Sequence, residues 1–229
     1  MIKAVIFDID NTLYSYDGAH EVAFAALTEY AVGKLGLQAE EFKSLHDNVK
    51  KGLEKTMKGH AALHNRLIRY QNMLEQKQIS LYPHVLRMHD IYWNTLIDNM
   101  IPSEGAVDTF RTLREMGLKI GIGTDMDAEI QFKKLEKLEL LQYVDFIVSS
   151  EEALAEKPDP KLLEYCCRKA GCQAQECMFV GDSLKKDALG AAACGMVGVW
   201  YAPDSIAALP ENVIRITSLK ETVKLVNKH

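Results

Sequence analysis

Short apolar runs recur along the chain, and the first of them begins almost at the N-terminus. Residues 4–7 (Ala-Val-Ile-Phe) form a continuous apolar run that stops at Asp8. A run of this length with β-branched residues is typical of a strand buried on both faces of a parallel sheet. Similar runs predict further strands at 118–123, 146–149, 178–181, 197–201 and 213–216.

Stretches with helical periodicity separate these predicted strands. They predict helices at 104–116, 127–139, 159–170, 184–194 and 218–227. The helix at 159–170 has a clear start signal, because Asp159 is a favourable N-cap and Pro160 fits the first helical position. Strands that alternate with helices predict an α/β fold with a doubly wound parallel sheet and right-handed crossovers.

A different pattern occupies the region between the first two strands. From Gly18 to about Met100 there is no strand-like alternation, and the periodicity predicts helices at 19–35, 39–58, 61–77 and 84–99. We therefore expect two domains: an α/β core made of 1–14 and 101–229, and an all-α insertion made of 15–100. Because the insertion directly follows the first strand, we expect its helices to lie over the carboxyl end of that strand.

Composition narrows the class of protein without deciding its function. The 229 residues are 48% hydrophobic and 26% charged, as in a globular protein with a sizeable core. A net charge of -5 gives no sign of a nucleic-acid partner. The apolar stretches fall short of the ~20 residues that a membrane span needs. No signal peptide is recognisable, and the five cysteines predict reduced thiols, so a cytoplasmic location is expected.

The end of the first strand carries two carboxylates. Asp8 and Asp10 are two residues apart, so in an extended chain both point to one side, about 7 Å from each other. Ligands of open α/β sheets bind at this carboxyl edge. Adjacent carboxylates repel each other unless a cation is bound or one is protonated. The two carboxylates therefore predict a bound Mg²⁺ ion, because Mg²⁺ prefers oxygen ligands.

Four sequence motifs, taken in order, resemble those of the haloacid dehalogenase-like hydrolase superfamily. They are Asp8-x-Asp10-x-Thr12 after the first strand, Thr124 after the second, Lys157-Pro158-Asp159-Pro160, and Gly181-Asp182-Ser183 followed by Asp187. The resemblance covers the whole chain. It implies a Rossmann-like core, with the inserted helices acting as a cap that closes on the substrate and selects it.

The resemblance also implies the roles of the acidic residues. Asp8 is expected to be the nucleophile that attacks phosphorus and forms an aspartyl-phosphate. Asp10 is expected to act as general acid and then general base, and its backbone carbonyl to reach the metal. Asp8, Asp182 and Asp187 complete the expected Mg²⁺ site, with Asp187 acting directly or through water.

A second group of residues is expected around the substrate. Thr124 offers a hydroxyl to a phosphoryl oxygen, and Lys157 places a cation beside the transition state. Tyr14 follows the nucleophile strand and is a candidate for lining the pocket. Asp125 departs from the family pattern, in which Asn is common. Asp125 faces the substrate or caps the helix that starts near Asp127, and the capping role is the one we expect.

These expectations define a function. The chain is predicted to be a Mg²⁺-dependent phosphatase that acts on a small soluble phosphate ester such as a nucleoside monophosphate, a sugar or flavin phosphate, or phosphoglycolate. A phosphomutase would use the same carboxylates, and a catalytically retired binding module is the alternative from another class. Dehalogenases of the superfamily need neither Mg²⁺ nor the second Asp, so Asp10 argues against that activity. Whether the protein is a monomer or a homodimer stays open.

Overall fold

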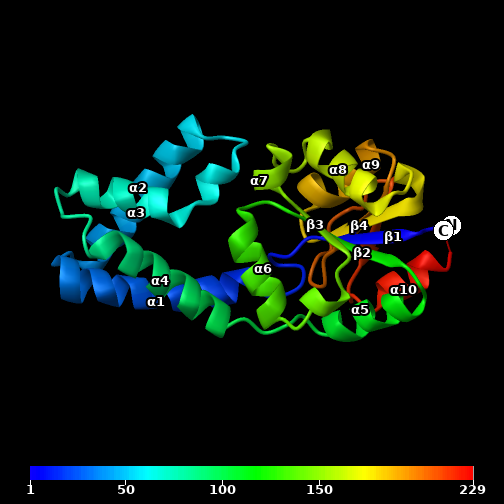
Figure 1. The fold of residues 1–229 in the computed structure, drawn as a ribbon, viewed down its shortest axis with the longest axis horizontal. Coiled ribbons are helices and arrows are strands. Elements are labelled where there is room, and N and C mark those ends of the chain that lie inside the picture. The colour runs from blue at the N-terminus through cyan, green and yellow to red at the C-terminus, as the bar shows by residue number, and fades with distance from the viewer. Residues whose placement is uncertain (229) are drawn as a thin grey trace. The chain divides into compact units, whose positions relative to one another are not determined.

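A computed structural model describes residues 1–228 of the chain, and it divides into two compact units (Figure 1). One unit joins Met1–Ser15 to Ile101–His229, and the other is Tyr16–Met100. We call the first the α/β unit and the second the helical unit.

The α/β unit is built on a six-stranded sheet in which every neighbouring pair is parallel. The strands are β1 (Ala4–Phe7), β2 (Lys119–Thr124), β3 (Phe146–Ser149), β4 (Cys177–Gly181), β5 (Val197–Tyr201) and β6 (Val213–Ile216). Their order is β3-β2-β1-β4-β5-β6, so β1 lies between β2 and β4. All four residues of β1 are buried, as its unbroken apolar run predicts.

Helices cover both faces of this sheet. They are α5 (Ala106–Glu115), α6 (Ala128–Lys137), α7 (Ser150–Ala153), α8 (Pro160–Ala170), α9 (Leu189–Ala193) and α10 (Glu221–Val226), with short 3₁₀ turns at Leu141–Tyr143 and Ala174–Glu176. In Figure 1, α8 and α9 lie on one side of the sheet, and α5 and α10 on the other. The predicted doubly wound α/β fold is confirmed.

Two helix starts in this unit show how the sequence sets local structure. Asp159 caps α8 by accepting a hydrogen bond from the Lys161 amide at 2.9 Å, with Pro160 at the first position. The helix predicted at 184–194 begins instead as a π-helical turn, Leu184–Ala188, and only then continues as α9. Such turns are frequent at functional sites, and this one carries Asp187.

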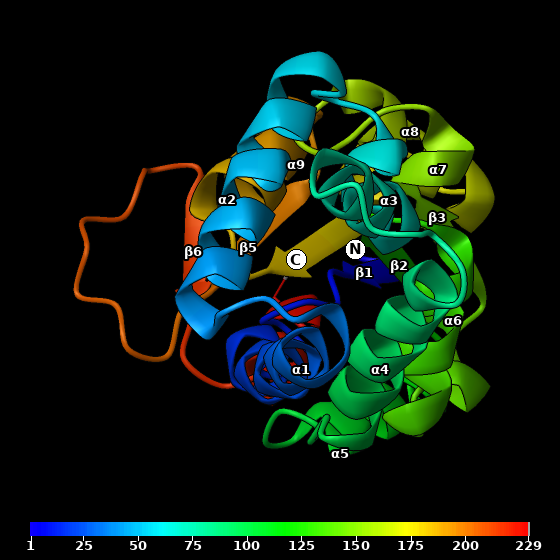
Figure 2. The same ribbon diagram turned by 90° about the vertical axis from the view of Figure 1, so that its left-hand side faces the viewer.

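The helical unit contains four α-helices: α1 (Tyr16–Tyr30), α2 (Ala39–Thr56), α3 (Arg66–Gln76) and α4 (His84–Asp98). A π-helical turn at Ala31–Leu35 extends α1, and a 3₁₀ turn at Ala61–His64 precedes α3. The helix predicted at 61–77 is therefore divided, because the Asn65 side chain caps α3 through the Leu67 amide. Figure 2 shows α1 and α4 side by side. No helix in residues 1–228 is both long and apolar enough to cross a bilayer.

Candidate active site

The sheet brings the predicted site residues to one edge of the α/β unit. In the parallel register, Phe7 at the end of β1 is level with Ile122 of β2 and Val180 of β4. Asp8 directly follows β1, Thr124 ends β2, and Asp182 directly follows β4. The carboxyl ends of three adjacent strands thus supply the site, as expected for an open α/β sheet.

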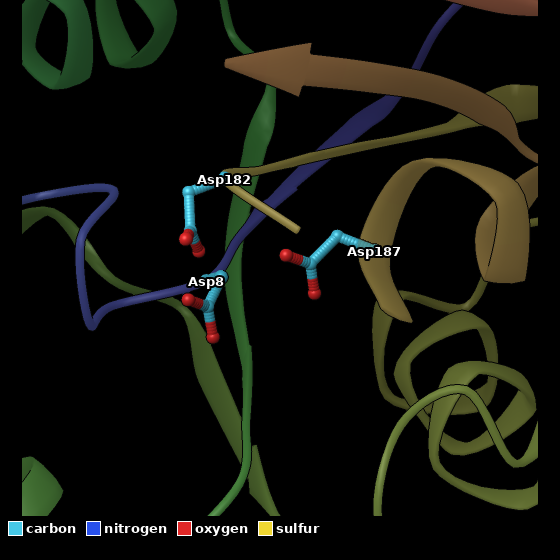
Figure 3. Close-up of side chains that lie close together, drawn as sticks. All are labelled: Asp8, Asp182 and Asp187. Carbon is cyan, nitrogen blue, oxygen red and sulfur yellow. The ribbon is translucent and has the colours of Figure 1, made fainter. Parts of the chain in front are cut away.

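Three carboxylates cluster at this edge (Figure 3). Oxygen atoms of Asp8, Asp182 and Asp187 all lie within 4.8 Å of one another. Gly181 makes room for this approach, because a Cβ built on it would lie 2.3 Å from Asp187 Oδ2. The same oxygen accepts a hydrogen bond from the Ser183 amide at 2.9 Å, which ties the carboxylate to the turn after β4.

Lys157 is the cation of this cluster. Its ammonium donates to Asp8 Oδ1 at 2.5 Å and lies 2.8 Å from Asp187 Oδ1. The lysine is almost completely buried. Burial alone would lower the pKa of Lys157, but the charges of Asp187 and Asp8 outweigh it and raise that pKa above its usual value. Lys157 is therefore a permanent positive charge between two of the carboxylates.

The surroundings raise the pKa values of two carboxyl groups in the cluster. Burial, together with the charges of Asp187 and Asp10, holds the pKa of Asp8 well above its usual range despite Lys157. Burial and the neighbouring Asp187 raise the pKa of Asp182 to about 6. Burial is the largest cause of both shifts, and the neighbouring carboxylates add to it. A bound cation would offset the charge of these carboxylates.

The donor set fits a hard divalent cation. All three candidate ligands offer carboxylate oxygen, which Mg²⁺ prefers. Asp187 Oδ1 is buried and makes no hydrogen bond of regular geometry in the described residues, although Lys157 lies near it. A carboxylate oxygen has more than one lone pair, so this atom can pair with Lys157 and also bind a cation. Asp8, Asp182 and Asp187 are thus the residues that would hold the ion.

The Asp10 carboxylate belongs to a different network. Its Oδ1 accepts from Tyr14 Oη at 2.5 Å and from Lys134 Nζ at 2.6 Å, and its Oδ2 lies 3.5 Å from Gln131 Nε2. Burial opposes ionisation of Asp10, but the charge of Lys134 prevails and lowers the pKa of Asp10. The pKa values of Asp8 and Asp10, which are two residues apart, are thus shifted in opposite directions.

Lys134 and Gln131 are the functional candidates that sequence reasoning missed. Both are fully buried, and they are three residues apart on α6. They interrupt the face of the helix on which Ile130 and Leu135 are buried. The sequence signal that could have identified them is that two polar residues occupy the face of an amphipathic helix that its apolar periodicity predicts to be buried.

Thr124 is buried and already hydrogen-bonded. Its Oγ1 accepts from Gln131 Nε2 at 2.6 Å and donates to the Asp125 carbonyl at 3.1 Å. Gln131 therefore touches both Thr124 and, at longer range, Asp10. The amide of Met126, in the turn that follows, donates to Ser150 Oγ at 2.9 Å.

The expectation that Asp125 caps the next helix is wrong. The N-cap of α6 is Asp127, and Asp125 Oδ1 instead accepts a hydrogen bond from the Lys157 amide at 2.9 Å. Asp125 Oδ2 pairs with Lys186 Nζ, also at 2.9 Å. The side chain turns back toward the loop that carries Lys157 because an amide and an ammonium group there offer two donors. Its negative charge is compensated by Lys186.

The site as a whole carries excess negative charge. Five carboxylates face three ammonium groups, so full ionisation leaves two negative charges, the amount that one divalent cation balances. The carboxylates are Asp8, Asp10, Asp125, Asp182 and Asp187, and the ammonium groups are Lys134, Lys157 and Lys186.

Comparison with known proteins decides the family. The family model of haloacid dehalogenase-like hydrolases matches residues 2–195. The chain belongs to this family. The predicted family is thereby confirmed.

The chain is similar to relatives that are named as phosphatases. It is 32% identical to the ribulose-1,5-bisphosphate 5-phosphatase of Halopiger xanaduensis, over 96% of this chain and 93% of the relative. It is also 32% identical to the glyceraldehyde 3-phosphate phosphatase of Methanopyrus kandleri, over 87% and 83% of the two chains. These names agree with the predicted enzyme class.

A solved structure supports the fold. The structure of a HAD phosphatase from Thermococcus onnurineus superimposes with a TM-score of 0.77 and covers 98% of both chains. Its sequence identity to this chain is 24%, so the likeness concerns the fold.

Proposed function

We propose that this protein hydrolyses phosphate monoesters of small sugar-type metabolites, with Mg²⁺ as cofactor and Asp8 as nucleophile. The observation that carries the proposal is the buried Asp8 carboxylate, hydrogen-bonded to Lys157 beside two further carboxylates that suit a cation. Phosphoryl transfer depends chiefly on positioning and on stabilising charge, and this site supplies a nucleophile, a fixed cation and metal ligands together.

In the first step, an oxygen of Asp8 attacks phosphorus. The bond between phosphorus and the ester oxygen breaks, and the leaving oxygen takes a proton from the carboxyl group of Asp10. The product alcohol departs, and the phosphoryl group stays on Asp8 as an acyl phosphate. Lys157 offsets the negative charge that develops on the phosphoryl oxygens.

In the second step, water attacks the same phosphorus atom. Asp10, now a carboxylate, accepts a proton from that water, and the bond between phosphorus and Asp8 breaks to release phosphate. Mg²⁺ bound by Asp8, Asp182 and Asp187 would neutralise charge on the phosphoryl oxygens. Thr124 and Lys157 are the proposed phosphate contacts. Asp125 positions the Lys157 backbone, and Tyr14 acts on the substrate through its hydrogen bond to Asp10.

The protonation state of Asp10 sets a condition on this cycle. Its pair with Lys134 favours the carboxylate, which is the form that the second step needs. The first step needs the acid form. A bound phosphate dianion raises the pKa of a nearby carboxyl group, so substrate binding would favour protonation of Asp10.

The two relatives at 32% identity favour a sugar-phosphate substrate. Ribulose 1,5-bisphosphate and glyceraldehyde 3-phosphate, which appear in their names, are both short phosphorylated sugars. A phosphomutase stays the second candidate, because the same carboxylates could return the phosphoryl group to a sugar hydroxyl. A retired module is disfavoured, since Asp8, Asp10, Lys157 and Asp182 are all present.

Phosphate release from a panel of sugar phosphates, nucleoside monophosphates and phosphoglycolate tests the proposal. We expect release with Mg²⁺, loss of release with EDTA, and loss in Asp8→Asn, which cannot form the acyl phosphate. Asp98→Asn, on an exposed position of α4, is the matched control and should keep wild-type turnover. Folded protein that binds Mg²⁺ but releases no phosphate from any ester would refute the proposal. Mutase activity would then be measured.

A further inference from the structure

The first turn of α3 carries two buried arginines. Arg66 and Arg69 are only 7% and 4% exposed, although arginine is seldom buried without a charged partner. Both lie at the N-terminal end of the helix, where the helix dipole disfavours positive charge. Two cations at this end of a helix suit an anion that they bind in common.

The hydrogen-bond partners of Arg66 are neutral. Its Nη2 donates to the hydroxyl oxygens of Tyr16 and Tyr92, each at 2.8 Å, and its guanidinium lies 4.3 Å from the centre of the Tyr92 ring. Arginine can only donate, so both tyrosine oxygens accept from Arg66. The Tyr92 hydroxyl also lies 2.7 Å from His20 Nδ1 and 3.2 Å from the Tyr16 hydroxyl. Burial and the charge of Arg66 lower the pKa of His20 to about 4, so His20 adds no charge to this group.

Arg69 is in a similar position. Its Nη1 lies 3.4 Å from Nε2 of His46, which must therefore accept. Burial and the charges of Arg66 and Arg69 lower the pKa of His46 to about 3. Burial and Arg66 also lower the pKa of Arg69 itself to about 10. Within residues 1–228, no carboxylate lies at ion-pair distance from either guanidinium.

Three buried donors on α3 lack an acceptor in the part of the chain that the structure describes. They are Arg66 Nε, Arg69 Nε and the Tyr70 hydroxyl. Residues 66, 69 and 70 have the spacing that places side chains on one helix face. Unsatisfied buried donors are rare in folded proteins, and several on one face call for an acceptor from outside the chain.

We propose that Arg66, Arg69 and Tyr70 bind a phosphate group within the helical unit. Phosphate oxygens only accept hydrogen bonds and carry the negative charge that the two guanidinium groups lack, and arginine matches them with paired N–H donors. Two sources offer this chemistry. One is the phosphate group of a soluble organic compound that binds the helical unit, and the other is free inorganic phosphate.

The site itself is tested without catalysis. Inorganic phosphate is titrated into the full chain in EDTA, and the side-chain Nε–Hε NMR signals of the arginines are followed. We expect the Arg66 and Arg69 signals to shift saturably, and the signal of Arg87, which is exposed on α4, to stay in place. In Arg69→Gln the shift of Arg66 should need about tenfold more phosphate, the factor that one charge-assisted hydrogen bond provides.

Lysine substitution separates binding from structural support. Arg69→Lys keeps the charge, so it should retain part of the affinity that Arg69→Gln loses. If the Arg66 and Arg69 signals of folded wild-type protein do not respond to phosphate, the proposal is overturned and the arginines serve the packing of the helical unit. That result is independent of turnover and leaves the proposed hydrolase function untouched.

The same titration with ribulose 5-phosphate, also in EDTA, separates the two sources. If the Arg66 and Arg69 signals saturate at about tenfold lower concentration with the ester than with inorganic phosphate, the site holds the phosphate group of an organic compound. Equal or weaker binding of the ester assigns the site to free phosphate.

Discussion

Gly181 sets the position of the Asp187 carboxylate, so adding one methyl group there should damage the proposed metal site. In Gly181→Ala, the new Cβ would lie 2.3 Å from Asp187 Oδ2, whereas ordinary contact begins near 3.4 Å. The difference, 3.4 minus 2.3, requires the carboxylate to move by about 1 Å. The Ser183 amide, which holds the same oxygen at 2.9 Å, resists that movement.

A displacement of this size has a known kinetic scale. Moving a catalytic group by about 1 Å can cost about a hundredfold in rate, which corresponds to about 2.7 kcal/mol of transition-state stabilisation. We therefore expect kcat/KM of Gly181→Ala to fall about a hundredfold. We also expect the Mg²⁺ concentration for half-maximal activity to rise, because Asp187 is one of the three carboxylates that would hold the ion.

Gly121→Ala is the matched control for overpacking. Its Cβ would lie 2.2 Å from the far end of the Phe146 ring, a clash as close as that at Gly181. Both variants should lose about 1–3 kcal/mol of unfolding free energy from overpacking. Only Gly181→Ala displaces a carboxylate. The assay is phosphate release against Mg²⁺ concentration, accompanied by thermal unfolding of each variant.

The comparison of Gly181→Ala with Gly121→Ala decides whether displacement of the Asp187 carboxylate causes the loss of activity. If both lose stability and only Gly181→Ala loses activity and Mg²⁺ affinity, the carboxylate position is the cause. If Gly181→Ala keeps wild-type kcat/KM and half-saturation, Asp187 either avoids the methyl group at no cost or is not needed where it lies. Either outcome would refute the role that we give to this contact.

Two further predictions concern the charges around the site. Lys134→Met removes the cation that lowers the pKa of Asp10, so the acid limb of the pH–rate profile should move to higher pH and kcat should fall by about tenfold to a hundredfold. Lys133→Met, at the exposed neighbouring position, should leave the profile unchanged, and an unshifted profile in Lys134→Met would contradict the pairing. The second prediction is that Mg²⁺ affinity weakens as pH falls through about 6, because burial and Asp187 raise the pKa of Asp182 and a metal ligand must lose its proton. Calorimetric titration of Mg²⁺ on either side of that pH tests it, and equal affinities would count against Asp182 as a ligand.

The sheet and the strand ends could be predicted from the sequence for a simple physical reason. A strand buried on both faces needs an unbroken apolar run, and the first polar residue after it marks the carboxyl edge of the sheet. Asp8, Thr124 and Asp182 were found in this way, and each lies at a strand end. The motif order then linked them to Lys157 and Asp187, which come from a loop and from a π-helical turn.

The partners of Asp10 and Asp125 could not be predicted in this way, because they depend on contacts between distant segments. Lys134 meets Asp10 across 124 positions of the chain, and Lys186 meets Asp125 across 61. A lysine on a helix gives the same local signal whether it is solvated or fully buried. Asp125 has two residues between itself and the start of α6, and only the fold shows that the Lys157 amide reaches it first.

The opposite pKa shifts of Asp8 and Asp10 explain why cofactor and substrate would both be needed for turnover. Without them, the pKa of Asp8, the proposed nucleophile, is raised by burial and by Asp187, while the pKa of Asp10, the proposed acid–base residue, is lowered by Lys134. Each shift favours the protonation state that the first step does not use. A cation held beside Asp8 lowers its pKa and frees the nucleophile, and a phosphate dianion beside Asp10 raises its pKa and favours the acid. The protein would therefore reach its reactive protonation state only when both are bound.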